Sequence, residues 1–142
     1  MTPTPAERVF RHSLDLLLAK DIDGWVALWA DDGVFEFPFA LPEGTRRLEG
    51  RDAVRAYIDG YPGHIDLHRF EDLVIHQTTD PEVVVAELRG VGRAVATGRP
   101  YDMPYVCVVT VRDGEIVRYR DYWNGALVAD AFEGGLPIGA RT

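Results

Sequence analysis

The clearest structural signal in this 142-residue chain is the stretch Asp113-Gly114-Glu115-Ile116-Val117-Arg118-Tyr119-Arg120-Asp121-Tyr122-Trp123. Its Asp-Gly pair is a strong signal for a β-hairpin turn, and the residues that follow alternate in character as those of a strand do. One face would carry Ile116, Arg118, Arg120 and Tyr122, and the other Val117, Tyr119, Asp121 and Trp123. Because the second face is more apolar, we expect it to point inward and to take the Asp121 carboxyl with it.

A carboxyl between two aromatic neighbours needs a chemical explanation. Burial penalises its charged form, so Asp121 must find a donor, coordinate a cation or keep its proton with a raised pKa. A carboxyl with a raised pKa is a candidate general acid or base. The alternative is a structural role, in which Asp121 is bonded to Arg or Tyr side chains of a neighbouring strand.

The rest of the chain predicts helices first and a meander of strands afterwards. Helical spacing begins at Pro5, where Val9, Phe10, Leu14, Leu17 and Leu18 share one side, and further helices are expected through Trp29 and over residues 50–58. A short strand is expected over 34–39, and longer ones over 67–77, 82–96, 101–111 and 116–124. This order predicts one α+β domain over residues 1–142, with helices on one face of a curved antiparallel sheet. Its interior would be a small-molecule site.

The amino-acid composition limits the kinds of partner that this chain can bind. The formal net charge is −8, so the surface repels phosphate backbones and nucleic acid is not expected as a partner. No stretch approaches membrane-spanning length, and residues 1–5 lack the features of a signal peptide. The single cysteine, Cys107, lies in an apolar run, which favours a packed, reduced thiol and a cytoplasmic location.

Three segments carry a family resemblance. They are residues 20–32 (KDIDGWVALWADD), residues 48–51 (LEGR) and the stretch 113–123. With the order of elements, they resemble the nuclear transport factor 2-like superfamily, in the branch that holds the SnoaL-like polyketide cyclases, the steroid Δ-isomerases and the phenazine proteins PhzA and PhzB. The resemblance implies a cone in which helices and a curved, mostly antiparallel sheet enclose a pocket. It also implies a homodimer that forms through the outer face of the sheet.

The catalytic residues of the steroid isomerases have no counterparts at the aligned positions of this chain. The catalytic Asp of those enzymes falls on Phe37, their oxyanion Tyr on Ser13, and their second Asp near Cys107. SnoaL-like cyclases and limonene epoxide hydrolases are closer, because they place a working Asp where Asp121 stands. The cyclases also use a His on the preceding strand, and here that position is again Cys107.

A charged pair one strand away is similar to that of the epoxide hydrolases. Those enzymes set an Arg and an Asp two residues apart, and the aligned positions here are Glu87 and Arg89, in reversed order. The alignment turns this pair toward the pocket, where it would join Asp121. The alternative is a structural ion pair with Asp121 as spectator.

The remaining candidates are aromatic residues and one histidine. His64 is a candidate acid or base at the pocket mouth. The candidate ligand-binding aromatics are Trp25, Phe37, Tyr57, Tyr105, Tyr119 and Trp123, which would suit a flat hydrophobic ligand if they are more than plain core. The sequence contains no metal-ligand spacing and no nucleotide-binding motif, so neither a metal nor a cofactor is predicted.

These observations leave three functions open. The first is cofactor-independent acid/base catalysis on a small hydrophobic or aromatic metabolite, as in a SnoaL-like cyclase or isomerase, with Asp121 as the proton-transfer group. The second is epoxide opening by Asp121 and Glu87. The third is ligand binding without chemistry, as an accessory protein of a biosynthetic pathway.

Overall fold

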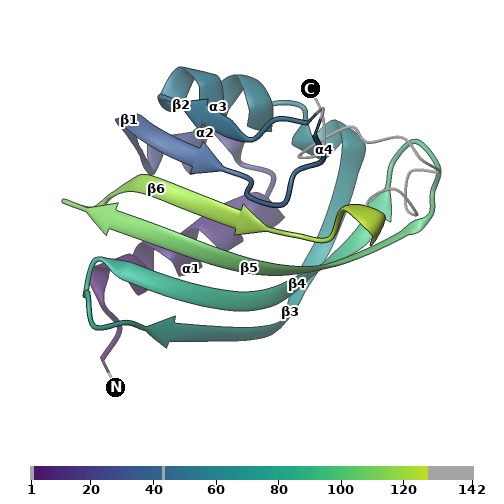
Figure 1. Ribbon diagram of the computed structural model, residues 1–142. Coiled ribbons are helices and arrows are strands. Elements are labelled where there is room, and N and C mark those ends of the chain that lie inside the picture. Colours follow the sequence, from purple (N-terminus) through teal and green to yellow (C-terminus); the bar gives the residue numbers. More distant parts are fainter. Residues whose placement is uncertain (1, 43, 128–142) are drawn as a thin grey trace.

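Helices cover one face of a curved sheet in the computed structural model, which describes residues 2–42 and 44–127 (Figure 1). The helices are α1 (Pro5–Leu18), α2 (Ile22–Ala27), α3 (Arg51–Ile58) and α4 (Tyr61–His64). Thr4 caps α1 by accepting a hydrogen bond from the Glu7 amide at 3.2 Å, and Asp21 caps α2 through the Gly24 amide at 2.9 Å. The α+β class predicted from the sequence is confirmed.

Six strands form one sheet in the described part of the chain. They are β1 (Trp29–Glu36), β2 (Arg47–Glu49), β3 (Ile65–Gln77), β4 (Val83–Ala94), β5 (Pro100–Arg112) and β6 (Glu115–Tyr122). Their order in the sheet is β2-β1-β6-β5-β4-β3, and β1 with β6 is the parallel pair. The last described strand, β6, therefore lies inside the sheet, hydrogen-bonded to β1 on one side and to β5 on the other.

A β-bulge in β6 changes the side of the sheet to which its side chains point. Thr110 pairs with Arg118, but Val111 pairs with Ile116, which leaves Val117 as the extra residue. Ile116 is thereby turned inward and is fully buried, next to the buried Val111. Ile116 was expected on the outer face from simple alternation, and the bulge is the physical reason that this expectation is wrong.

The first strand begins earlier than its sequence suggests. Residues through Trp29 are predicted as helix, yet α2 ends at Ala27 and Trp29 opens β1. The Trp29 side chain is fully buried and its ring stacks on Tyr119, with centroids 6.1 Å apart. Burial of two large aromatic surfaces outweighs the local helical signal. The short elements β2 and α4 have no counterpart in the prediction.

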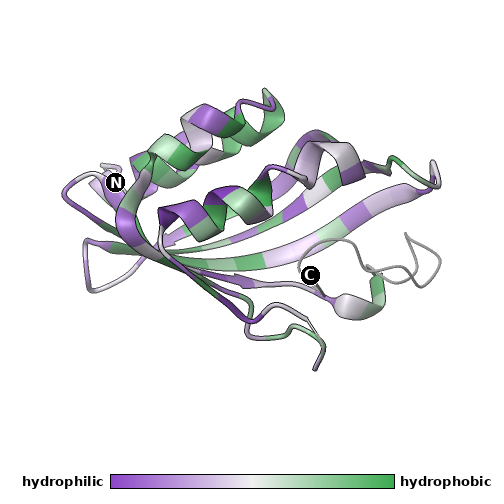
Figure 2. Cartoon of the chain, turned by 90° about the horizontal axis from the view of Figure 1, so that it is seen from above, coloured by the Kyte–Doolittle hydropathy of each residue, from purple (hydrophilic) through white to green (hydrophobic). Residues whose placement is uncertain are grey.

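The core lies between the helices and the sheet, and Figure 2 shows these two layers from above. The α1 helix packs on β3 and β5, and α3 packs on β1. At the α3 end, Phe35 contacts Phe37 and Tyr119 at ring-centroid distances of 4.5 and 4.9 Å. Among the described residues, no helix has both the length and the apolar character that crossing a bilayer requires.

Candidate active site

A cavity lies between the helices and the inner face of the sheet. Its volume is about 80 Å³, so it has room for more than one water molecule. The wall is mostly aliphatic and aromatic, with tyrosine hydroxyls and one carboxyl among its polar groups. The lining residues come from α1, α2, α3, α4 and every strand except β2.

The carboxyl in this wall belongs to Asp121, near the end of β6. Asp121 lies directly opposite Cys107 of β5 in the strand register. The Cys107 thiol approaches Asp121, with Sγ 3.8 Å from Oδ1, and the Tyr119 hydroxyl donates to Sγ at 3.3 Å. The described residues thus give the carboxyl a single and weak donor.

Burial dominates the electrostatics of Asp121. It raises the pKa of this carboxyl to about 7, and the hydrogen bond from Cys107 opposes the rise. No Lys, Arg or His lies among the described residues that line the cavity, so no nearby cation offsets the negative charge. Burial also raises the pKa of the Cys107 thiol, and the charge of Asp121 raises it further.

Tyrosine hydroxyls are further polar groups of the wall. Five tyrosines line the cavity: Tyr57, Tyr61, Tyr101, Tyr105 and Tyr119. Burial raises the pKa of each hydroxyl, and the negative charge of Asp121 contributes to the rise in all five. These groups therefore stay neutral at physiological pH and act as hydrogen-bond donors.

This arrangement suits proton transfer. A carboxyl with a pKa near 7 is both a competent base and a competent acid at neutral pH, and the match between pKa and pH makes proton transfer efficient. Neutral hydroxyls around it can stabilise negative charge that develops on a ligand oxygen. Among residues 2–42 and 44–127, no three His, Cys, Asp or Glu side chains form a group that could hold a metal ion.

Most of the predicted ligand-binding aromatics line the cavity, and these are Trp25, Tyr57, Tyr105, Tyr119 and Trp123. Two candidates do not. Phe37 is 1 % exposed and packs behind the wall against Phe35 and the Tyr57 ring. His64 ends α4 with an exposed side chain and is not a lining residue.

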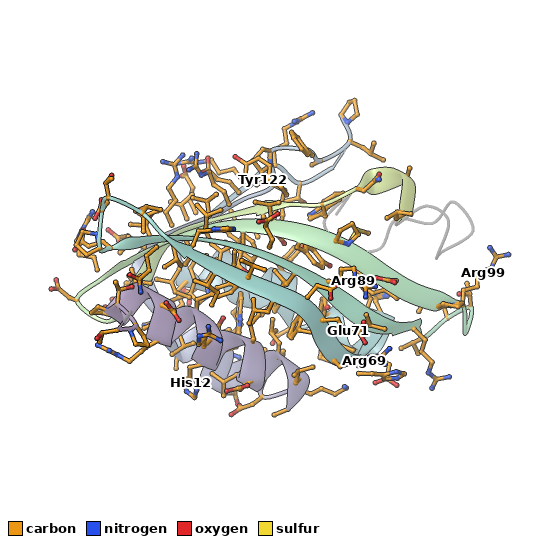
Figure 3. The ribbon with its side chains drawn as sticks, turned by 90° about the horizontal axis from the view of Figure 1, so that it is seen from below. His12, Arg69, Glu71, Arg89, Arg99 and Tyr122 are labelled. Carbon is orange, nitrogen blue, oxygen red and sulfur yellow. The ribbon has the colours of Figure 1, made fainter. Side chains whose placement is uncertain are left out.

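Glu87 and Arg89 lie on the opposite face of the sheet, so the prediction that they share a pocket with Asp121 is wrong. The Arg89 guanidinium binds Asp72 at 2.9 Å and both Glu71 and Asp102 at 2.6 Å. Figure 3 labels Arg89 beside Glu71. Glu87 is exposed, with Oε2 2.7 Å from Nε2 of His76.

The inner face of β4 is formed by the alternate set of residues. Val84 and Ala86 are fully buried and Leu88 is 4 % exposed, whereas Glu87 is exposed. Both sets contain valine, so alternation alone did not select the face. Glu87 and Arg89 point outward because the outer face is hydrated and offers Arg89 three carboxylate partners. The apolar cavity would leave both charges without water.

Tyr61 and Tyr101 are lining residues that sequence reasoning missed. Tyr101 has the same strand parity as Tyr105 and Cys107, so alternation over 101–107 was the signal that could have found it. Tyr61 follows α3 in a Tyr-Pro-Gly sequence that reads as a turn, and its inward position depends on the short helix α4.

Similarity to known proteins extends over most of the chain. Residues 10–119 match the SnoaL-like domain family. The uncharacterized protein YesE of Bacillus subtilis is 43 % identical over 127 residues, which cover 89 % of this chain and 86 % of that protein. An uncharacterized PhzA/B-like protein of Pseudomonas aeruginosa is 37 % identical over 136 residues, which cover 96 % of this chain and 95 % of that protein.

Solved structures show the same architecture. The crystal structure of a Bacillus subtilis protein provisionally assigned as an isomerase has a TM-score of 0.90 and 39 % identity, covering 94 % of this chain and 96 % of that one. A Mycobacterium tuberculosis protein solved in complex with estradiol-17beta-hemisuccinate has a TM-score of 0.76 and 24 % identity. The alignment with it covers 87 % of this chain and 97 % of that one, and it shows likeness of fold alone.

Proposed function

The chain belongs to the SnoaL-like domain family of the nuclear transport factor 2-like superfamily, and on that premise we propose that it is a cofactor-independent enzyme in which Asp121 transfers a proton. Its substrate is a small, mainly hydrophobic ring compound. The reaction is of the cyclase or isomerase type, in which a proton is removed from a carbon next to a carbonyl group.

One observation carries the proposal: the Asp121 carboxyl opens into an apolar cavity whose described lining residues include no cation. A structural carboxylate is normally held by Arg, Lys or several amide donors. Asp121 has only the Cys107 thiol among the described residues, at 3.8 Å. The high proton affinity that results has no structural benefit, but it is what a general base needs.

The proposed step conserves charge in the cavity. Ionised Asp121 takes a proton from the carbon next to the carbonyl, and the electron pair of that C–H bond moves to make an enolate. The single negative charge passes from the carboxylate to the enolate oxygen, where neutral tyrosine hydroxyls stabilise it. The protonated Asp121 then returns the proton to another carbon. Alternatively, the enolate carbon attacks a second carbonyl and closes a ring, and the resulting alkoxide takes the proton from Asp121.

Ligand binding without chemistry is the second candidate. It is favoured by the aromatic wall of the cavity and by the fold-level likeness to a protein that was solved with a steroid derivative. In that case Asp121 would be one polar contact of a binding pocket. The two functions differ in whether the protein moves a proton of its ligand.

Epoxide opening has lost its support. It requires a second carboxyl beside Asp121, and the candidate for that role was Glu87. Glu87 is exposed on the outer face of the sheet, 2.7 Å from His76. Among the described lining residues, Asp121 is the sole carboxyl.

A homodimer through the outer face of the sheet is part of the proposal. That face has a groove of about 690 Å³ whose wall includes Phe39, Val74, Val106 and Tyr122. Phe39, Val74 and Val106 are 64 %, 49 % and 39 % exposed, and such an apolar patch favours association.

We also propose a cytoplasmic location, because Cys107 is a buried free thiol.

Exchange of carbon-bound hydrogen tests the catalytic proposal directly. The probe is 2-tetralone, a bicyclic ketone, dissolved in D₂O, and NMR follows the loss of the signals of the hydrogens next to its carbonyl. We expect the wild-type protein to accelerate this exchange above the buffer rate. Asp121→Asn should lower the protein-dependent rate by about 10²-fold or more while the variant still binds the ketone.

Glu87→Gln is the matched control, because it makes the same chemical change on the opposite face of the sheet. Its exchange rate should equal that of the wild type. An Asp121→Asn variant that exchanges the ketone as fast as the wild type would refute the proposal. A wild-type protein that binds 2-tetralone without accelerating exchange would favour the binding function.

A further inference from the structure

Two of the tyrosine hydroxyls in the cavity wall form a hydrogen-bonded pair. The hydroxyls of Tyr101 and Tyr105 hydrogen-bond to each other, and both residues line the cavity. Tyr105 precedes Cys107 by two residues on the inner face of β5, which places its Cα roughly 7 Å along the strand from the Cα of the cysteine whose thiol contacts Asp121. The hydroxyl pair and the carboxyl are therefore within reach of one small ligand.

Counting protons shows what the pair can do. Two hydroxyls that bond to each other use one of their two protons between them. No other hydrogen bond from either hydroxyl occurs within the described residues, so the second proton remains available to an acceptor in the cavity. The hydroxyl that receives the internal bond is polarised by it and becomes a better donor.

The residues around the pair favour an acceptor without charge. Burial and the nearby Asp121 charge keep both hydroxyls protonated, and the described lining residues include no Lys, Arg or His. A carboxylate or phosphate ligand would meet the Asp121 charge in a poorly solvated cavity with no cation to offset it. A neutral oxygen, such as a ketone or an ether, can accept the free proton without that penalty.

We propose that the Tyr101–Tyr105 hydroxyl pair is the specificity site of this pocket, and that it selects uncharged, oxygen-bearing ring compounds over hydrocarbons and over organic anions. The inference rests on the proposed function in so far as it assigns the ligand to the same cavity. It adds two residues that neither hold nor move the proton of Asp121 but set which molecule is presented to it.

A binding series tests the pair. The probes are 2-tetralone, the hydrocarbon tetralin with the same carbon skeleton, and the anion 2-naphthoate. We expect wild type to bind 2-tetralone about tenfold more tightly than tetralin, as one hydrogen bond allows. At pH 8, where Asp121 is ionised, 2-naphthoate should bind more weakly than 2-tetralone, and this difference should shrink at pH 5.5.

The decisive variant is the double substitution Tyr101→Phe with Tyr105→Phe. A single substitution leaves one hydroxyl of the pair that can still donate, but the double one removes both, so most of the preference for 2-tetralone over tetralin should be lost. Replacing both partners of a buried hydrogen bond by apolar groups of similar shape is close to neutral for stability. Tyr122→Phe, on the outer face, is the control and should keep the preference.

A double variant that retains the wild-type preference for 2-tetralone would overturn the proposal, and so would equal binding of 2-naphthoate and 2-tetralone at pH 8. A measurement on the wild-type protein gives an independent check: the carbonyl stretching band of bound 2-tetralone should lie at lower frequency than in an apolar solvent. An unshifted band would also contradict the proposal. Failure here leaves the Asp121 exchange result intact, and the two inferences are thereby separable.

Discussion

The thiol of Cys107 faces the carboxyl of Asp121 across β5 and β6, with Sγ 3.8 Å from Oδ1. A thiol is a weak donor, so it orients the carboxyl while leaving its affinity for a proton high. A guanidinium or imidazolium at this position would hold the carboxylate ionised and make it a poor base. The weakness of this contact is what connects the geometry of β5 to the proposed chemistry of β6.

The exchange rate of 2-tetralone should rise with pH around neutrality. Burial raises the pKa of Asp121 to about 7, and the ionised form is the base, so the rate should increase through a midpoint near pH 7 and level off above it. Protein-dependent exchange measured from pH 5 to 9 checks this. A profile without an inflection over that range would show that another group removes the proton.

Substitutions at Cys107 should move that midpoint in opposite directions. The thiol hydrogen bond lowers the pKa of Asp121, so Cys107→Ala should shift the midpoint upward. Cys107→Ser provides a stronger donor and should shift it downward. The pH profiles of the two variants and the wild type give the three midpoints. Identical midpoints in all three would mean that the contact has no influence on the base.

Asp121→Asn should stabilise the protein at alkaline pH. The folded-state pKa is about 7, against an ordinary value of 3.8 for an aspartate in the unfolded chain. Below pH 3.8 both states carry the proton and there is no effect. Between these values the unfolded chain loses its proton first, so the free energy of unfolding falls as pH rises, by about 4 kcal/mol once the pH exceeds 7.

The variant removes this penalty, and we expect it to unfold with a free energy roughly 2–4 kcal/mol higher than wild type at pH 8 and nearly equal at pH 4. Urea denaturation at the two pH values measures the difference. A variant that is less stable than wild type at pH 8 would indicate that the carboxylate has a structural role instead.

Gly92→Ala should strongly destabilise the fold. A Cβ at this position would lie 2.0 Å from the backbone oxygen of Asp66, where β3 and β4 shift register. Since backbone must move to relieve such a contact, we expect a loss of about 3 kcal/mol or more. Gly63→Ala is the control, because no atom lies within 4 Å of a Cβ there. Thermal unfolding of both variants compares them, and equal melting temperatures would be inconsistent with the close approach.

Val106→Glu should convert the proposed dimer into a monomer. Val106 is 39 % exposed on the outer face and lies in the wall of its groove, and a buried carboxylate there would oppose association. Val95→Glu is the matched control, because Val95 is 45 % exposed and lies beyond the end of β4, outside that groove. Light scattering at micromolar concentration gives the masses. A monomeric wild type would exclude the dimer.

Local patterns were sufficient for most elements and for the face of β6 that carries Asp121. The helix start at Pro5 and the turn at Asp113-Gly114 depend on residues close in sequence, which is why they could be predicted. The inward direction of Tyr119, Asp121 and Trp123 followed from alternation, because their apolar neighbours clearly prefer one side.

Predictions failed where the direction of a side chain depends on residues that are distant in sequence. The two faces of β4 are similarly apolar, so only pairing with β5 and the carboxylates around Arg89 fix their direction. The bulge at Val117 reverses the facing of Ile116 through the pairing of two strands, which the sequence of one strand does not encode. The Tyr101–Tyr105 contact likewise depends on the curvature of the sheet.

The position of β6 in the sheet also determines when the site comes into being. This strand is the last described strand along the chain, yet it lies between β1 and β5, and its pairing joins Val34 to Arg118. Contacts so distant in sequence form slowly. Until this strand is paired, the edges of β1 and β5 that it covers are open and the Asp121 carboxyl has the acidity of an aspartate in water. Its unusual basicity is acquired at the same event that joins the two parts of the sheet, so a chain truncated before β6 has neither a finished fold nor a base.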